Sequence, residues 1–116
     1  MTYKLFIDDE RYTHEVVWAP ADVRASYETD TWLIARNMTE VMDIVKSLGM
    51  PSFVSFDHDL GDGERTGYDI AKAMVDMDMD GTEVFPADFS FYVHSQNPVG
   101  KKNIENYLDN YFNYRD

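Results

Sequence analysis

Ionisable side chains directly follow three short apolar segments of this 116-residue chain, and these residues have the clearest chemical potential. Moving a charge out of water costs free energy unless a partner, a metal ion or a ligand compensates for it. Charged residues at the end of a buried segment therefore indicate a functional site. The three sets are Asp8-Asp9-Glu10 after residues 4–7, Asp57-His58-Asp59 at the end of residues 53–57, and His94-Ser95 after residues 89–93.

Three of these carboxylates are candidate metal ligands. Hard carboxylate oxygens are the ligands that Mg²⁺ and Mn²⁺ prefer in proteins. A pair of aspartates after one strand is often only a solvated rim, but an aspartate at the end of a second strand strengthens the case for a metal. We therefore predict that Asp8, Asp9 and Asp57 bind a divalent cation, Mg²⁺ or Mn²⁺. The expected supporting residues are Glu10, Arg11 and Asp59.

Two histidines and one predicted helix start indicate phosphate chemistry. An imidazole has an ordinary pKa of about 6.5, so it can donate or accept a proton near neutral pH. His58 and His94 are therefore the predicted acid–base pair. Ser95 and the backbone N–H groups after Asn97 are predicted to bind a phosphate, because a helix start carries unpaired donors and a partial positive charge. The alternatives are structural: a buried, hydrogen-bonded histidine and a simple helix cap.

Short apolar runs alternate with amphipathic segments along the chain. Strands are predicted at residues 4–7, 32–35, 53–57 and 89–93. Helices are predicted from the cap Asn37 to Gly49, over the apolar positions 68–77, and from Asn97-Pro98 to about residue 113. Residues 12–30 lack a convincing period and contain Pro20, so they are predicted to form a long surface loop with at most a helical turn near residues 21–27.

This alternation predicts an α/β fold in which a four-stranded parallel sheet is covered on both faces. No regular helix is expected between the first two strands. Ligands of such sheets bind at the carboxyl ends of the strands. All three ionisable sets lie at that edge, so we expect them to form one site.

Composition restricts the functions that are plausible. An apolar content of 44% over 116 residues predicts one domain, residues 1–116. The net charge of -12 argues against binding of extended duplexes, which normally requires clustered Lys and Arg, although a cyclic nucleotide or a nucleic-acid end remains a possible partner. No apolar run reaches the roughly 20 residues that cross a bilayer, and the N-terminus lacks the layout of a signal peptide, so we expect a cytoplasmic protein without membrane contact. The sequence contains no cysteine for disulfides or thiolate metal sites.

Several motifs together resemble a known family. LFIDDE followed by FDHDLG resembles the receiver domain of response regulators, in which an acidic pair and an aspartate bind a divalent cation. The wider pattern is similar to a divergent family, the cyclic-phosphate processing receiver domain. The resemblance implies a reduced flavodoxin-like sheet of order 2-1-3-4 in three α/β/α layers, and a role with cyclic phosphate ends in RNA repair. The motifs are LFIDDER, Trp32, Ala35-Arg36-Asn37, SFDHDLG, TGYDIA and HSQNPVGKKNI.

The chain departs from ordinary receivers, which place a lysine after a fifth strand. Lys101 and Lys102 lie within the last predicted helix instead, which argues against phosphotransfer signalling. Two functions follow from the resemblance. The favoured one is a metal-assisted phosphoesterase acting on RNA 2′,3′-cyclic phosphate ends or cyclic nucleotides. The alternative is a noncatalytic module that binds or sequesters a cyclic nucleotide or a protein partner. The histidine pair favours the enzyme, because a protein-binding module does not need it.

Overall fold

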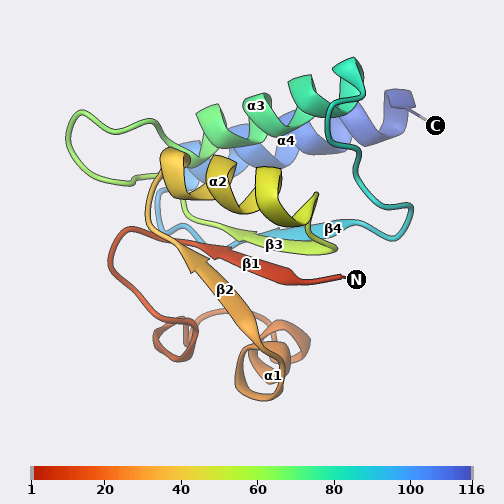
Figure 1. The fold of residues 1–116 in the computed structure, drawn as a ribbon. Helices are drawn as coiled ribbons and strands as arrows, with labels where there is room; N and C mark the ends of the chain where they lie inside the picture. The colour runs from red at the N-terminus through yellow and green to blue at the C-terminus, as the bar shows by residue number, and fades with distance from the viewer. Residues whose placement is uncertain (1, 116) are drawn as a thin grey trace.

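The computed structural model describes residues 2–115 and contains a four-stranded parallel sheet (Figure 1). The strands are β1 (Lys4–Ile7), β2 (Trp32–Ala35), β3 (Phe53–Phe56) and β4 (Ser90–Val93). Their order across the sheet is β2-β1-β3-β4, and every neighbouring pair is parallel. The predicted fold class and strand order are confirmed.

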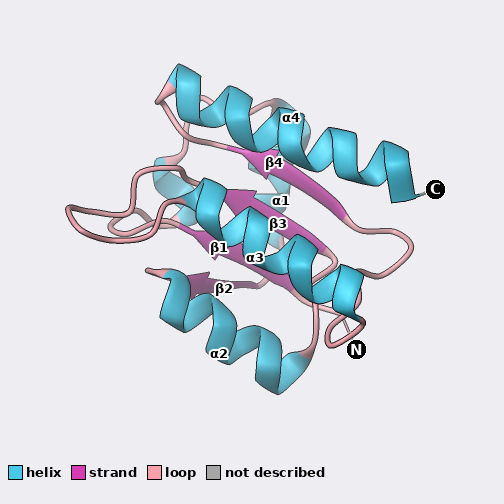
Figure 2. Ribbon diagram, turned by 90° about the horizontal axis from the view of Figure 1, so that it is seen from above, coloured by secondary structure: helices cyan, strands magenta, loops and turns pink. Residues whose placement is uncertain are grey.

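Helices cover both faces of the sheet. Three helices, α2 (Met38–Leu48), α3 (Gly67–Asp80) and α4 (Pro98–Arg115), lie on one face, and Figure 2 looks onto that face. The short helix α1 (Ala21–Thr29) lies on the other face (Figure 1). The fold is therefore the predicted three-layer α/β/α arrangement. Every helix within residues 2–115 is too short or too polar to span a bilayer.

The prediction of no regular helix between the first two strands was wrong. Residues 12–30 contain a 3₁₀ turn, Thr13–Glu15, and the nine-residue helix α1, before which Pro20 is the N-cap. The helix escaped prediction because it buries only Val23 and Tyr27, one turn apart, and so lacks an apolar stripe. Tertiary packing stabilises it, since both residues join a small core with Phe6 of β1.

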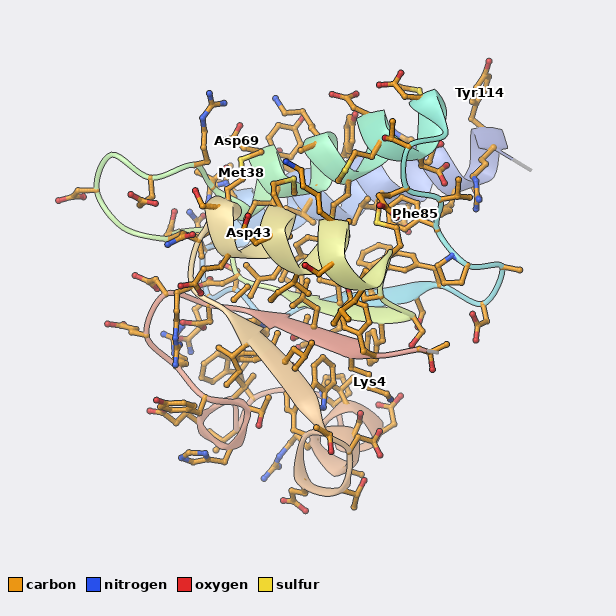
Figure 3. All side chains as sticks on the ribbon, in the orientation of Figure 1. Lys4, Met38, Asp43, Asp69, Phe85 and Tyr114 are labelled. Carbon is orange, nitrogen blue, oxygen red and sulfur yellow. The ribbon has the colours of Figure 1, made fainter. Side chains whose placement is uncertain are left out.

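The larger core lies between the sheet and α2, α3 and α4. It contains alternate residues of the strands, such as Leu5, Ile7, Val54 and Phe56. Phe85, in the loop before β4, is part of this core, whereas Tyr114 near the end of α4 points away from it (Figure 3). The side chains of Phe6 and Ser55 belong to the opposite face, toward α1.

Side-chain caps fix the helix starts at the site. Asn37 caps α2 by accepting a hydrogen bond from the backbone N–H of Glu40, and Thr66 caps α3 in the same way. At the start of α4, the backbone N–H of Gly100 donates to Oδ1 of Asn97 at 3.1 Å. Gly67 is required at the start of α3, because a Cβ atom there would overlap with the backbone carbonyl of Asp57. This close approach fixes α3 against the end of β3.

Candidate functional site

Four polar residues form a row at the carboxyl edge of the sheet. Each is the first residue after a strand: Arg36 after β2, Asp8 after β1, Asp57 after β3 and His94 after β4. Backbone hydrogen bonds continue the strand ladder through this row, from Asp8 to Ala35, from Asp57 to Ile7 and from His94 to Phe56. The parallel register therefore brings these residues side by side, as expected from the sequence for Asp8, Asp57 and His94 but not for Arg36.

Asp8 lies at the centre of the row and is fully buried. Its Oδ1 atom accepts the backbone N–H groups of Glu10 at 3.0 Å and Arg11 at 2.9 Å. Its Oδ2 atom lies 3.0 Å from Nε2 of His94 and 3.3 Å from Nη1 of Arg11. Burial opposes ionisation, but the hydrogen bonds from His94 and from the two backbone groups outweigh it and hold the pKa of Asp8 well below its ordinary value. Asp8 is therefore a carboxylate.

A chain of buried hydrogen bonds runs from α1 to Asp8 along the α1 face of the sheet. The hydroxyl of Tyr27 lies 2.5 Å from Oγ of Ser55, and Oγ of Ser55 lies 2.7 Å from Nδ1 of His94. Because Asp8 can only accept, Nε2 of His94 carries the hydrogen that it donates to Asp8. The His94 ring is 0% exposed and stacks on Phe6, with centroids 4.6 Å apart. Both ring nitrogens of His94 are therefore occupied.

The two histidines do not meet around one ligand position. His94 lies beneath the surface on the α1 side, because the alternation along β4 places it on the same face as Ser55. The His58 ring packs against Gly100 of α4, and its Nδ1 lies 2.9 Å from Oδ1 of Asp59. Neither ring lines the pocket described below. The predicted acid–base pairing of His58 with His94 therefore does not match this geometry, and a catalytic role for either histidine stays a prediction.

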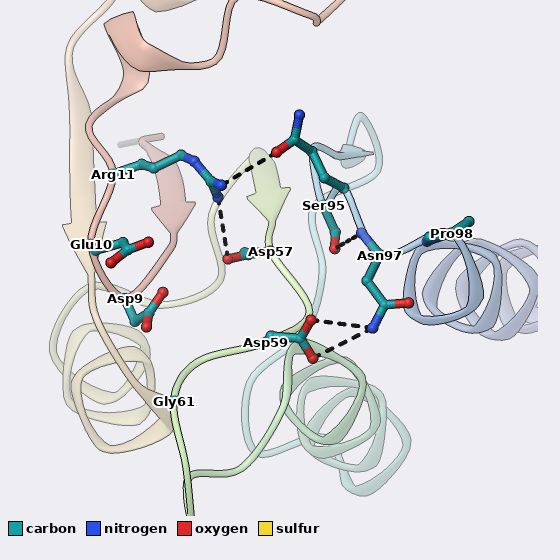
Figure 4. A pocket seen from close by; sticks show the side chains of 10 residues that line it. Asp9, Glu10, Arg11, Asp57, Asp59, Gly61, Ser95, Asn97 and Pro98 are labelled. Atoms are coloured by element: carbon teal, nitrogen blue, oxygen red, sulfur yellow. Dashed lines mark hydrogen bonds and ion pairs between the residues drawn. The ribbon is translucent and has the colours of Figure 1, made fainter.

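An open pocket of about 550 Å³ lies above the row (Figure 4). Its wall comes from the segments after β1, β3 and β4, and it brings together most of the predicted site residues. Within it, Nη1 of Arg11 lies 3.8 Å from Oδ2 of Asp57, and the side-chain amide of Asn97 donates to Asp59 at 3.2 Å. The lining residues are Asp9, Glu10, Arg11, Asp57, Asp59, Gly61, Ser95, Gln96, Asn97 and Pro98.

Asp57 connects the buried row with the pocket. It is only 5% exposed, yet it lines the pocket. Its Oδ1 atom accepts the backbone N–H of His58 at 2.8 Å, whereas Oδ2 makes no hydrogen bond within residues 2–115 and only the long ion pair with Arg11. Burial raises the pKa of Asp57, and the nearby charge of Asp8 raises it further. A cation close to Oδ2 would stabilise this carboxylate.

The row contains a group that could hold a metal ion. One ligand atom each from Asp8, Asp57 and His94 lie within 4.8 Å of one another. The two carboxylates fit Mg²⁺ or Mn²⁺, but His94 already donates from Nε2 to Asp8, so the imidazole fits less well as a ligand. Asp9, the third predicted ligand, lines the pocket and does not belong to this group.

Two arginines, Arg11 and Arg36, lie beside the row, and each guanidinium lies over an aromatic ring, Trp18 for Arg11 and Tyr12 for Arg36. Arg36 donates to the backbone carbonyl oxygens of Asp8 at 3.0 Å and Arg11 at 2.6 Å, which fixes the turn after β1. The Arg11 guanidinium lies over the ring of Trp18 at 5.2 Å from its centroid. Trp18 itself donates from Nε1 to the backbone carbonyl of His94 at 2.8 Å.

Several of these residues were not identified from the sequence. Ser55 had a signal, since it is the polar residue within the otherwise apolar segment Phe53–Phe56. Tyr27 was missed because helix α1 was not predicted. Gln96 is in the HSQNP segment, but only the structure reveals that its Oε1 lies 3.5 Å from Nη2 of Arg11. Trp18 had no visible signal in an irregular segment.

Comparisons with known proteins agree with this fold. The model of a family described as "Cyclic-phosphate processing Receiver domain" matches residues 3–110. One similar solved structure contains the yeast Spc42 trimeric coiled coil, amino acids 181–211, in a fusion; the identity is 19% and the TM-score 0.56, and the match covers 90% of this chain and 62% of that chain. This likeness shows the fold alone. No curated protein matches the chain.

Proposed function

The chain belongs to the cyclic-phosphate processing receiver domain family, and on that premise we propose that it hydrolyses a cyclic phosphate with the help of a divalent cation. The substrate would be an RNA 2′,3′-cyclic phosphate end or a cyclic nucleotide. The single observation that supports this best is the pocket, where a guanidinium, a hydroxyl, two side-chain amides and four carboxylates from three strand ends face one space.

Binding of the phosphoryl group would use the donors of the pocket. The Arg11 guanidinium and the Ser95 hydroxyl line it on opposite sides (Figure 4). Asn97 contributes its side-chain amide, and the first turn of α4 begins directly behind it. Arginine is well suited to this role because its planar fork can bind two phosphoryl oxygens at once.

Asp8 and Asp57 would hold the cation. A bound Mg²⁺ or Mn²⁺ supplies positive charge to the phosphoryl oxygens and to the attacking water. Asp57 faces this position with Oδ2, while its other oxygen stays bonded to the backbone. The supporting argument is electrostatic, because two carboxylates lie close together in a buried row and share one nearby guanidinium.

Asp59 is the candidate proton acceptor of this reaction. Hydrogen bonds from His58 and then from Asn97 lower the pKa of Asp59, so the side chain is ionised at neutral pH. It is 67% exposed and lines the pocket, so a water molecule can reach it. The water oxygen would attack phosphorus as Asp59 takes its proton, one ring P–O bond would break, and the released ribose oxygen would take a proton from solvent. His58 would position Asp59 rather than act on the substrate.

The noncatalytic alternative has one observation in its favour. The burial and double hydrogen bonding of His94 remove one of the two predicted proton-transfer groups from the pocket. A module that only binds a cyclic nucleotide or a protein partner would keep the donors and the cation but would not need a proton acceptor.

The test is incubation of the purified chain with a panel of cyclic nucleotides and RNA 2′,3′-cyclic ends, each with Mg²⁺, with Mn²⁺ and with EDTA. We expect a phosphomonoester product with metal, little product with EDTA, and loss of product in Asp57→Asn. Binding of a ligand that stays intact under every condition would overturn the enzymatic proposal and favour the binding module.

A further inference from the structure

Arg11 lies between the two carboxylates that would hold the cation. Its Nη1 atom is 3.3 Å from Oδ2 of Asp8 and 3.8 Å from Oδ2 of Asp57. No other lysine or arginine side chain within residues 2–115 forms an ion pair with either carboxylate. The guanidinium therefore partly neutralises the two carboxylates, and it occupies the position at which a divalent cation would do so.

We propose that Arg11 is a cation placeholder: a divalent ion displaces its guanidinium from Asp8 and Asp57 and moves it into the pocket, toward the phosphoryl group. This inference rests on the cation of the proposed function. It adds that metal binding and arginine release are one coupled event. The Arg11 guanidinium then becomes free to bind a phosphoryl group, beside Ser95 and Asn97, only when the metal is present.

Charge repulsion is the first reason for this coupling. A dication and a guanidinium that both contact the same two carboxylate oxygens would lie within a few ångströms of each other, in a site that is largely removed from water. The ion pairs of Arg11 are long, at 3.3 and 3.8 Å, whereas Mg²⁺ binds carboxylate oxygens at about 2.0–2.1 Å. The shorter contacts of a doubly charged ion favour displacement of the arginine.

The carboxylates keep their positions without Arg11. Asp8 retains the backbone N–H groups of Glu10 and Arg11 and the Nε2–H group of His94. Asp57 retains the backbone N–H group of His58. When the guanidinium leaves, other donors still hold both side chains. The two carboxylates are therefore already in position to bind the metal.

The Arg11 side chain already reaches the pocket. It lines the cavity (Figure 4), its side chain is 28% exposed, and its Nη2 lies 3.5 Å from Oε1 of Gln96, which also lines the cavity. Rotation about its side-chain bonds can move the guanidinium without moving the backbone, which Asp8 and Arg36 hold. The hydrogen bonds that hold the Arg11 backbone therefore do not prevent its side chain from turning into the pocket.

Trp18 provides a reporter of this movement. The guanidinium lies 5.2 Å from the centroid of its ring, whereas the indole N–H is anchored to the carbonyl oxygen of His94. Trp18 should therefore stay in place when Arg11 moves. Its fluorescence should change because the Arg11 guanidinium no longer lies over the indole ring. The only other tryptophan, Trp32, can be removed by Trp32→Phe.

The experiment titrates Mn²⁺ into the Trp32→Phe protein and into the same protein with Arg11→Met, with free Mn²⁺ followed by EPR, and follows Trp18 emission in a parallel titration with Mg²⁺, which is diamagnetic and does not quench the indole itself. Arg65→Met is the control, because it removes one exposed positive charge from a loop outside the pocket. We expect Arg11→Met to bind Mn²⁺ about tenfold more tightly or better, since hydrogen bonds to charged groups contribute that much, and Arg65→Met to change little. Trp18 emission should respond to Mg²⁺ only where Arg11 is present.

The outcomes separate this inference from the proposed function. Equal Mn²⁺ affinity in both proteins, with no change in Trp18 emission, overturns the placeholder and leaves the cation of the proposed function intact. No Mn²⁺ binding in any variant overturns that cation, and the placeholder with it. Should Arg11→Met fail to fold, the emission of the Trp32→Phe protein with Mg²⁺ decides alone: a change that saturates with binding supports the displacement, and an unchanged signal overturns it.

Discussion

The Nε2 atom of His94 lies 3.0 Å from Oδ2 of Asp8, and both side chains are fully buried. This contact joins the ends of β4 and β1, which are separated by β3 in the sheet. Through Nδ1, His94 also reaches Ser55 and then Tyr27 of α1. Because Asp8 alternates onto the same face as Phe6, this chain of hydrogen bonds holds the carboxylate from the α1 side of the sheet.

Replacement of His94 should reveal the contribution of this chain to stability. In His94→Phe, a ring can still stack on Phe6, but Asp8 and Ser55 each lose a buried partner, which costs about 1–3 kcal/mol per group. His94→Gln keeps a donor and an acceptor and should recover part of the loss. Urea denaturation of the three proteins measures the free energies of unfolding. Equal stability of wild type and His94→Phe would contradict the structural role of the chain.

Tyr27→Phe should lower the free energy of unfolding by about 1 kcal/mol at neutral pH, because one buried hydrogen bond is lost. Burial raises the pKa of Tyr27 above its ordinary value of 10.0. A group with a raised pKa in the folded state contributes stability that is full below its unfolded pKa and is lost as the pH rises through the folded value. The difference in the free energy of unfolding between wild type and Tyr27→Phe should therefore become smaller above pH 10. Denaturation at pH 7 and near pH 11 measures this difference. A constant gap would contradict the burial of this phenol.

Much of the fold could be predicted because the strand signals are local. The runs around Phe6 and Val54 are apolar and stop abruptly, and caps such as Asn37 mark the helix starts. Helix α1 could not be predicted in this way, since its stability comes from contacts of Val23 and Tyr27 with residues of the sheet. Contacts between distant segments leave no period in the sequence.

The site was predictable in its location but not in its bonding. Parallel strands bring their carboxyl ends together, so Asp8, Asp57 and His94 had to meet at one edge. Whether His94 faces a ligand or the core depends on the pleat and on the length of β4, and only the register shows that it faces Ser55. Asp9, one residue further along the chain than Asp8, does not belong to the group of Asp8, Asp57 and His94.

Gly100→Ala tests the packing of His58 on α4. Alanine favours a helix by about 1 kcal/mol over glycine, but the added Cβ would overlap with the His58 ring. We expect a net loss of stability in Gly100→Ala. In the His58→Ala background the same change should stabilise the protein, because the ring is gone. A double-mutant cycle of unfolding free energies measures this change of sign, and additive effects would show that the ring and the helix do not pack as described.

Asp57→Asn should change both the stability of the metal-free protein and its response to metal. Asp57 is nearly buried and lies close to the charge of Asp8, so removal of its charge should raise the melting temperature of the metal-free protein. Each kcal/mol of relieved repulsion should raise the melting temperature by about 4 °C. Millimolar Mg²⁺ or Mn²⁺ should raise the melting temperature of the wild type and have little effect on the variant. Equal shifts in both proteins would place the metal elsewhere.

Asp59→Asn tests the proposed proton acceptor directly. The asparagine keeps the size of the side chain and can still contact His58 and Asn97, but it cannot accept a proton from water. Turnover of a cyclic phosphate should fall by about 10²-fold or more, the usual contribution of a positioned proton-transfer group. The free energy of unfolding should change little, because the side chain is exposed. Asp62→Asn is the matched control, since Asp62 lies in the same loop, is exposed and does not line the pocket. If kcat is the same in Asp59→Asn and Asp62→Asn, then Asp59 is not the acceptor, and the proton must go to another group of the pocket.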